Sequence, residues 1–225
     1  MSLPVYSRIK YSFIVLLFLL LIVLFVLICI NIFGMAFKKL GFPPEYSIYF
    51  LFLSLLGSYV NLPLMKIKSL VPVIPSRVID FYYTGYAVSS HNVEMCTSIS
   101  LNLGGAVIPV IISIFLSTMV SLVDVLIGIL LITILVHKIA KPVKGSGMAI
   151  HSFLPSILAA LTALTISPQN APIIAYISGT FGCLIGIDIL NLEKIPDMGV
   201  PAVSIGGAGT FDAIFLTGII SVLLA

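Results

Sequence analysis

The sequence predicts an all-α integral membrane protein with about seven transmembrane helices. Of its 225 residues, 60% are hydrophobic and only 8% are charged, whereas a soluble domain has roughly 25% charged residues. The long uncharged runs are continuously apolar, which favours helices over strands with alternating polarity. A net charge of +3 without any run of basic residues excludes a nucleic-acid-binding protein. The lipid bilayer is therefore the expected partner.

The uncharged runs place the predicted spans at roughly 20 residues per helix. The first run is much longer than the roughly 7–15 apolar residues of a cleavable signal, so we expect it to be retained as a helix. Prolines and polar residues in "SPQNAP" (167–172) divide one long run into two spans. The predicted spans, which together form a single polytopic domain (1–225), are residues 11–34, 46–64, 101–118, 121–137, 148–166, 171–190 and 204–225.

Basic residues predict the orientation of these spans in the cell membrane. If the N-terminus is cytoplasmic and the C-terminus external, only Lys38 and Lys39 of the 11 Lys and Arg residues lie outside, as the positive-inside rule favours. The cytoplasmic segment between the second and third spans contains "RVIDFYYTGYAV" (77–88) and "VEMCTSISLNL" (93–103) on either side of "SSHN". This composition predicts a β-hairpin, whose edge suits pairing with an extended peptide.

Two aspartates are the main candidates for function. Asp188 lies in "FGCLIGIDILNLEK" at the cytoplasmic end of the sixth span. Asp212 follows Ser204 by eight residues, which places it roughly 12 Å into the seventh span. An acid at that depth is costly and indicates a functional site. Alternatively, Asp188 marks the headgroup level, and Asp212 caps a helix that begins after the glycines.

Two facing carboxyl groups share a proton, so one acts as a base and the other as an acid. The base activates a water that attacks a peptide carbonyl, and the acid protonates the oxyanion or leaving nitrogen. Asp188 and Asp212 are therefore the candidate catalytic pair. The candidates for positioning a substrate are Gly206, Gly207, Gly209, Thr210, Asn102 and His151.

These candidates have simpler alternatives. The glycines alternatively serve close helix packing, and Asn102 and His151 alternatively lie at the membrane interface. No cofactor is expected. No metal site is expected either, because the spacing of His91, Glu94 and Cys96 fits no established ligand pattern.

The arrangement of Asp188 in the sixth span and Asp212 after Gly207-Ala208-Gly209 resembles intramembrane aspartyl proteases of the presenilin and signal-peptide-peptidase type. That resemblance implies a hydrolase that cleaves a transmembrane peptide. The sequence departs from this pattern at several points. Ile187, not tyrosine, precedes Asp188, and two residues separate Gly209 from Asp212, which rotates the acid by about 200° around a helix.

Longer segments resemble an uncharacterised prokaryotic family of multi-pass membrane proteins with a domain of unknown function. The matching segments are "LGSYVNLPL" (56–64), "NLGGAVIP" (102–109) and most of 171–225, with "GIDILNL" and "SIGGAGTFDAIFLTG". This resemblance implies a membrane location and no established activity.

Two other function classes remain open. "LGGAV" (103–107) and "IGGAG" (205–209) both open spans that run from the inside to the outside. A pair of glycine-broken helix starts is typical of transporters that bind an anion, H⁺ or Na⁺. A non-catalytic membrane protein is the third class. We expect the presenilin-like protease first, and the distance between the two carboxyl groups distinguishes it from the transporter. The sequence predicts no particular substrate and no oligomeric state.

Overall fold

The computed structural model describes residues 5–73, 91–143, 147–207 and 209–225, and most of these residues are helical. The chain divides into two compact units, Met1–Leu51 and Phe52–Ala225. Three described segments are long and apolar enough to cross a membrane: Leu17–Lys39, Leu122–Ile139 and Pro168–Lys194. A predominantly helical fold with candidate membrane spans is therefore confirmed.

The first unit contains α1 (Val5–Lys39) and the beginning of α2 (Tyr46–Gly57). Aromatic packing holds the turn between the two helices. The ring of Phe37 stacks on Phe50 at 5.4 Å between centroids, and Phe42 lies 5.8 Å from Phe37 and 6.1 Å from Phe50. The large apolar side chains between residues 17 and 28 are exposed, so this helix surface is suited to lipid.

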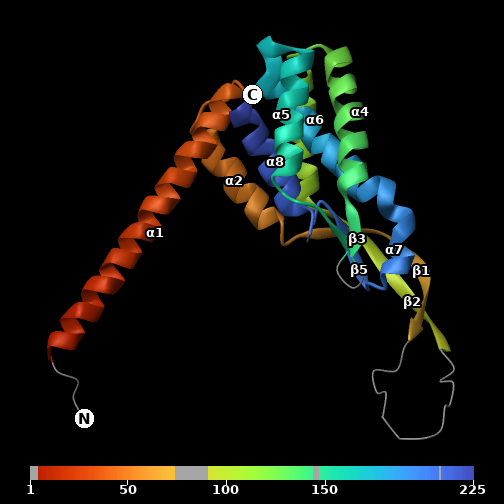
Figure 1. Cartoon of the computed structure of the whole chain (residues 1–225), viewed down its shortest axis with the longest axis horizontal. Coiled ribbons are helices and arrows are strands. Elements are labelled where there is room, and N and C mark those ends of the chain that lie inside the picture. Colours follow the sequence, from red (N-terminus) through yellow and green to blue (C-terminus); the bar gives the residue numbers. More distant parts are fainter. Residues whose placement is uncertain (1–4, 74–90, 144–146, 208) are drawn as a thin grey trace, which may run out of the picture. The chain divides into compact units, whose positions relative to one another are not determined.

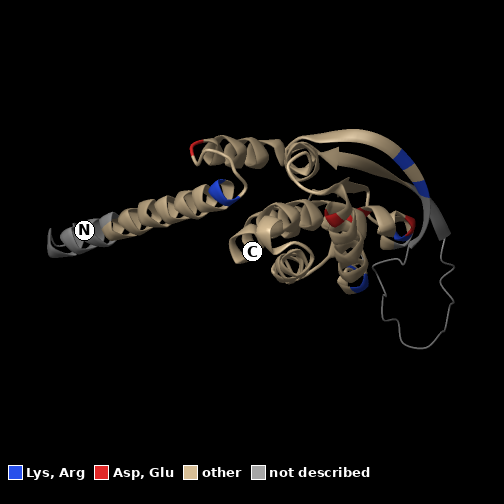
Figure 2. Ribbon diagram, turned by 90° about the horizontal axis from the view of Figure 1, so that it is seen from above, with Lys and Arg blue, Asp and Glu red and all other residues tan. Residues whose placement is uncertain are grey.

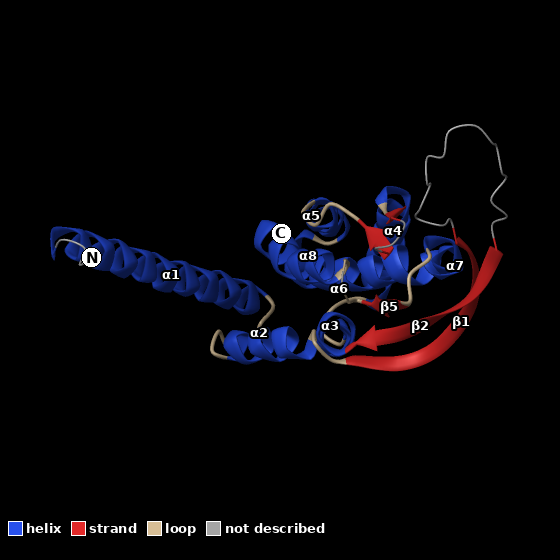
Figure 3. Ribbon diagram, turned by 90° about the horizontal axis from the view of Figure 1, so that it is seen from below, coloured by secondary structure: helices blue, strands red, loops and turns tan. Residues whose placement is uncertain are grey.

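The second unit contains a three-stranded sheet in the order β1-β2-β5 (Figure 3). β1 (Asn61–Val73) pairs antiparallel with β2 (His91–Asn102), and β5 (Ala202–Ile205) pairs parallel with β2. A register shift between Pro63 and Met65 interrupts the first pair. A separate ribbon consists of β3 (Lys141–Val143) and β4 (Gly147–Ala149).

A helical bundle completes the second unit (Figure 1). A π-helical turn (η1, Leu103–Val107) leads into α3 (Ile108–Ser117), which is followed by α4 (Leu122–Ile139) and α5 (Leu154–Ile166). α6 (Ala171–Cys183) continues through the π-helical turn η3 (Leu184–Asp188), the 3₁₀ turn η4 (Ile189–Lys194) and the short α7 (Ile195–Met198). A 3₁₀ turn, η2 (Pro168–Asn170), precedes α6, and α8 (Phe211–Leu224) ends the chain.

α6 is the central helix, because it packs against α3, α4, α5 and α8. Small residues on it allow close approach. A Cβ at Gly182 would lie 2.5 Å from Ile132 Cγ2 of α4, and a Cβ at Gly179 would lie 2.6 Å from Thr217 Cγ2 of α8. Such small-residue contacts are typical of helix packing in membranes.

Several predicted spans are corrected by the structure. Four of them correspond to apolar helices of 10–17 residues, shorter than the roughly 20 that a span needs. The predicted span 46–64 is helical only to Gly57, and its last residues belong to β1. Span 101–118 begins in β2 and continues into η1, and span 148–166 begins in β4, with its helix starting at Leu154.

The predicted span 204–225 begins in β5, and its helix starts only at Phe211. Gly206 and Gly209 have φ values of 70° and 96°, which side chains other than glycine rarely adopt, so the helix is broken before Asp212. The last predicted span is therefore broken before α8, and a helix that begins after the glycines was one of the two arrangements expected for it.

The predicted hairpin is present with a different first strand. Its second strand agrees with the prediction, but the partner is Asn61–Val73. The predicted first strand, 77–88, lies outside the described residues. Pro63 and Pro72 argued against predicting the observed strand, because proline is disfavoured in strands except at a sheet edge. β1 lies at such an edge.

Candidate functional site

Two strand–glycine–helix units meet at the centre of the candidate site. Residues 98–101 of β2 pair in parallel with residues 202–205 of β5, so both chains leave the sheet in the same direction. β2 continues into η1, and β5 is followed by a glycine-rich turn whose described residues, Gly206, Gly207, Gly209 and Thr210, precede α8. A Cβ at Gly105 would overlap the carbonyl oxygen of Gly206 and lie 2.7 Å from Phe211 Cδ2. Only glycine at position 105 permits this contact.

Asp188 joins the end of α6 to this turn. It is the last residue of the π-helical turn η3, and only 6% of its surface is exposed. Its Oδ2 accepts hydrogen bonds from the Gly206 N–H at 2.7 Å and from the Thr210 hydroxyl at 3.3 Å. The same hydroxyl lies 3.4 Å from the Gly207 carbonyl, so Gly206 gives the firmer bond. Within the described part of the chain, no hydrogen bond reaches Asp188 Oδ1.

Asp188 lines a cavity of about 270 Å³, which we call the Asp188 cavity. One part of its wall is polar and consists of Ser58, Asn61, Ser100, Asn102, Asn191, Ser204 and Thr210. The other part is mostly apolar and consists of Gly147, Met148, Leu192, Ile195, Met198, Ala202, Val203 and Ile205. None of these described lining residues is Lys, Arg or His. The carboxyl group therefore faces the cavity without an opposite charge in its wall.

Asn102 ties the elements around the cavity together. Its Nδ2 donates to the Ser58 carbonyl at 2.7 Å and to Asn61 Oδ1 at 3.0 Å. Its Oδ1 accepts the Gly105 N–H at 2.8 Å, which caps η1. Asn61 Oδ1 also accepts the Ser204 hydroxyl at 2.5 Å, which links β1 to β5. Asn102 lines the predicted site, but its polar atoms are already used to hold the structure.

Asn191 connects the cavity wall to two basic side chains that do not line it. Its Nδ2 lies 2.9 Å from the Ile187 carbonyl, 3.0 Å from the Gly186 carbonyl and 3.3 Å from His137 Nδ1. Its Oδ1 accepts a hydrogen bond from Lys194 Nζ at 2.7 Å. The amide therefore has a partner at both ends, and Lys194, which donates to it, does not line the cavity.

Asp212 faces a different cavity. It is exposed in the first turn of α8 and lines a space of about 290 Å³ with Ser58, Tyr59, Gly207, Gly209 and Phe211. Asp188 does not line this space, and Asp212 does not line the Asp188 cavity. Asp188 lies close to the start of α8, because Thr210, which donates a hydrogen bond to it, stands two residues before Asp212. The two carboxyl groups line separate cavities, whereas a catalytic pair needs both groups in one cavity.

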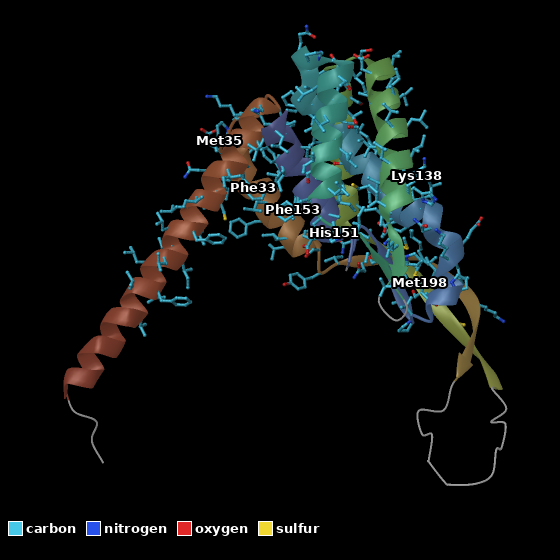
Figure 4. The ribbon with its side chains drawn as sticks, viewed as in Figure 1. Phe33, Met35, Lys138, His151, Phe153 and Met198 are labelled. Carbon is cyan, nitrogen blue, oxygen red and sulfur yellow. The ribbon has the colours of Figure 1, made fainter. Side chains whose placement is uncertain are left out.

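The other predicted positions separate in the same way. Gly206 and Thr210 donate hydrogen bonds to Asp188, whereas Gly207 and Gly209 line the cavity that contains Asp212. His151 is exposed in the segment before α5 and lines neither space (Figure 4). Its predicted role in positioning a substrate has no geometric support at either cavity.

Sequence reasoning missed Asn61, Asn191 and Ser204 as site residues. All three stand in segments that carried the family resemblance, namely "LGSYVNLPL", "GIDILNL" and "SIGGAGTFDAIFLTG". Each is a polar residue within an apolar run, which was the signal that identified the aspartates. Across the described residues, no group of three or more His, Cys, Asp or Glu side chains comes together. Any cation at Asp188 would therefore depend on neutral oxygen atoms as well as the carboxylate.

Comparisons with known proteins place the chain in a family without assigning an activity. No curated protein and no solved structure is found to match it. None of the comparisons supports the resemblance to presenilin-type proteases. The model of a family described as "Protein of unknown function (DUF1614)" matches residues 55–224, which is most of the chain and nearly all of the second unit. The chain belongs to the DUF1614 family.

Proposed function

We propose that this chain is a multi-pass membrane protein that binds a cation at Asp188, as the coupling ion or the substrate of a transporter. The observation that carries the proposal is a buried carboxyl group in a cavity whose described lining contains no basic side chain. An unpaired ion away from water is costly, so a buried carboxylate needs a cation, a proton or a basic partner. A cation or a proton is left, because the described wall supplies no basic partner.

The hydrogen bonds of Asp188 favour its ionised form as a ligand. Gly206 N–H and the Thr210 hydroxyl both donate to Oδ2, and donors directed at a carboxylate stabilise its negative charge. Oδ1 is left for a cation in the cavity. This pre-arranged carboxylate fits an ion-binding site better than it fits one half of an acid–base pair.

The broken helices support the transporter class. η1 and the glycine-rich turn before α8 both precede short helices, and their backbones touch at Gly105 and Gly206. Discontinuous helices that meet at a polar site are typical of secondary transporters. The strand pairing does not align the two glycine motifs. Ile205, the first residue of "IGGAG", pairs with Leu101, which lies two residues before "LGGAV" (103–107). The two units are therefore similar in arrangement without being a strict repeat.

The proposed membrane location rests on apolar surface. Three described segments have span-like length and hydropathy, and long stretches of the helices carry no charged side chain (Figure 2). We keep the cytoplasmic N-terminus and the external C-terminus as part of the proposal, because that orientation leaves most basic residues inside. A reporter fused after Ala225 should be active only outside the cell membrane. Activity inside would contradict the orientation.

The second candidate function is the two-aspartate protease. The observation in its favour is that the turn that precedes Asp212 is bonded directly to Asp188. The separate cavities of the two aspartates count against it. Cleavage of a transmembrane peptide that is abolished by both Asp188→Asn and Asp212→Asn would establish the protease in place of the transporter.

The experiment measures cation-dependent stability of the purified full chain in detergent. A cation panel of Na⁺, K⁺ and small organic ammonium ions replaces choline at constant ionic strength. A ligand at 100 times its Kd stabilises a protein by about 2.7 kcal/mol. At roughly 2–4 °C per kcal/mol, Tm should rise by about 5–11 °C. Asp188→Asn should abolish the rise, whereas Asp212→Asn should keep it.

Uptake into proteoliposomes then tests transport of the cation that stabilises the protein. Lys144→Gln is a further control, because Lys144 lies outside the described residues and precedes the lining residue Gly147. If Lys144 neutralised Asp188, removing its charge would tighten cation binding. That gain, or an unchanged Tm rise in Asp188→Asn, would overturn the proposal.

A further inference from the structure

We propose that the cation in the Asp188 cavity is the primary ammonium group of a small organic amine. This inference rests on the proposed cation site and names its ligand. Four features of the cavity carry it: its volume, the commitment of its amide oxygens, its apolar wall and the absence of aromatic residues from its described lining.

The volume exceeds what a single ion needs. A space of about 270 Å³ is many times the roughly 10–15 Å³ that is enough to hold one water molecule. It lies just below the roughly 300 Å³ at which pockets for larger organic ligands begin. A ligand with on the order of ten non-hydrogen atoms or fewer therefore matches this cavity.

Every amide oxygen of the wall already accepts at least one hydrogen bond. Asn61 Oδ1 accepts two hydrogen bonds, Asn102 Oδ1 accepts one from a backbone N–H, and Asn191 Oδ1 accepts one from Lys194. Hard metal cations need about six oxygen ligands around them. An ammonium group has only three N–H donors, so it needs three acceptors.

The lining contains at least three acceptors for these donors. Asp188 Oδ1 has no hydrogen bond from the described residues. Ser58 and Ser100 donate their hydroxyl protons to the carbonyls of Leu55 and Val203, so their oxygens keep lone pairs for an N–H donor. The carboxylate supplies the charge, and the two hydroxyl oxygens supply the remaining polar contacts.

The opposite wall suits the body of such a ligand. Met148, Ile195 and Met198 line the cavity and are at least nine-tenths buried. Methionine fills irregular apolar space well, but it is a poor ligand for hard cations. Met198 belongs to α7, which follows directly after the 3₁₀ turn next to Asp188 (Figure 4). A short hydrocarbon chain attached to the ammonium group would contact this wall.

The lining also selects the type of amine. Quaternary ammonium ions are recognised through the faces of aromatic rings. None of the described lining residues is Phe, Tyr or Trp. A primary amine instead uses N–H donors, which match the carboxylate and hydroxyl oxygens that are present.

The experiment uses the purified full chain and isothermal titration calorimetry. The probes are methyl-, ethyl-, propyl- and butylammonium chloride, with NaCl, tetramethylammonium chloride and butanol as comparators. Affinity should rise about fourfold per methylene, because each buried methylene contributes about 0.8 kcal/mol. Tetramethylammonium and butanol should bind at least tenfold more weakly than butylammonium.

Two variants separate the two ends of the ligand. Asp188→Asn should abolish binding of every amine. Met198→Ala should flatten the dependence on chain length and leave methylammonium nearly unchanged, and Met198→Leu should restore the dependence. Binding of Na⁺ that depends on Asp188, without binding of amines, would overturn this inference and leave the cation site standing. Absence of any Asp188-dependent cation binding would overturn both proposals.

Discussion

Replacing Gly105 by alanine tests the contact that builds the site. A Cβ at this position would overlap the Gly206 carbonyl oxygen and lie 3.1 Å from the Gly206 carbonyl carbon. The neighbour is backbone, which cannot rotate away as a side chain would. The turn that donates to Asp188 must therefore move, or η1 must separate from it.

The expected cost has two parts. Overpacking of a tight contact costs about 1–3 kcal/mol, and a backbone neighbour favours the upper end of that range. Displacing Gly206 also stretches its 2.7 Å bond to Asp188, and a hydrogen bond to a charged group contributes about 1.5–3 kcal/mol. A total of about 3 kcal/mol or more should lower Tm by roughly 6–12 °C at this chain length. Binding at Asp188 should weaken in parallel.

Thermal unfolding followed by circular dichroism in detergent measures the effect. The matched control is Gly34→Ala in α1, where the nearest atoms to the added Cβ are 3.7 and 4.0 Å away. That substitution should keep or slightly raise Tm, because alanine is favoured over glycine in a helix by roughly 0.5–1 kcal/mol. A Gly105→Ala protein that unfolds within about one degree of the original would refute the backbone contact on which the magnitude rests.

Two further substitutions probe neighbouring groups. Asn102→Ala should lower the unfolding free energy by about 1–3 kcal/mol, because it leaves the buried Gly105 N–H without its cap, and denaturation in mixed micelles measures this loss. A change below about 0.5 kcal/mol would show that Asn102 is not a structural tie. Asp212→Asn should leave calorimetric cation affinity unchanged and cost only about 0.3–1 kcal/mol, because an acid in the first turn of α8 interacts favourably with the helix dipole. A tenfold loss of affinity would place Asp212 in the same site as Asp188.

The sequence predicted the acid of the candidate site for a sound physical reason. Asp188 is an ionisable residue within an apolar run, and such a residue needs a compensating partner wherever it lies. The glycine cluster before Asp212 predicted a possible break in the last helix, and positive φ values at Gly206 and Gly209 account for it. Local composition was sufficient for both inferences, because an acid in an apolar run and a cluster of glycines are visible among neighbouring residues.

The polar lining of the Asp188 cavity depended on contacts between distant parts of the chain. Asn61 and Ser204 are 143 positions apart and meet through a hydrogen bond across the sheet. That contact requires β5 to pair with β2, and four residues of strand leave almost no periodic pattern in the sequence. The direction in which Asp212 faces depended on where α8 begins, and a shift of two residues rotates a side chain by about 200°.

The short α8 gives Asp188 a structural role besides the proposed binding role. Its 14 residues extend about 21 Å, whereas a hydrocarbon core is about 30 Å thick. If α8 crosses a membrane, as the proposed function implies, the residues before it lie at membrane depth, where non-helical backbone is tolerated only inside protein or along a wet cavity. β5 pairs with β2, and the Gly206 N–H finds its acceptor in Asp188. The carboxyl group thus satisfies backbone that would otherwise lack a partner.

Two substitutions of Asp188 distinguish these roles. Asparagine keeps an oxygen that accepts the Gly206 N–H and removes a buried charge, so Asp188→Asn should have an equal or higher Tm in cation-free buffer. Alanine removes the acceptor, and a buried N–H without a partner costs about 1–3 kcal/mol, so Asp188→Ala should unfold roughly 2–12 °C lower than Asp188→Asn. Both variants should lose cation binding. If alanine were as stable as asparagine, the Gly206 bond would not support α8, and Asp188 would serve the cavity alone.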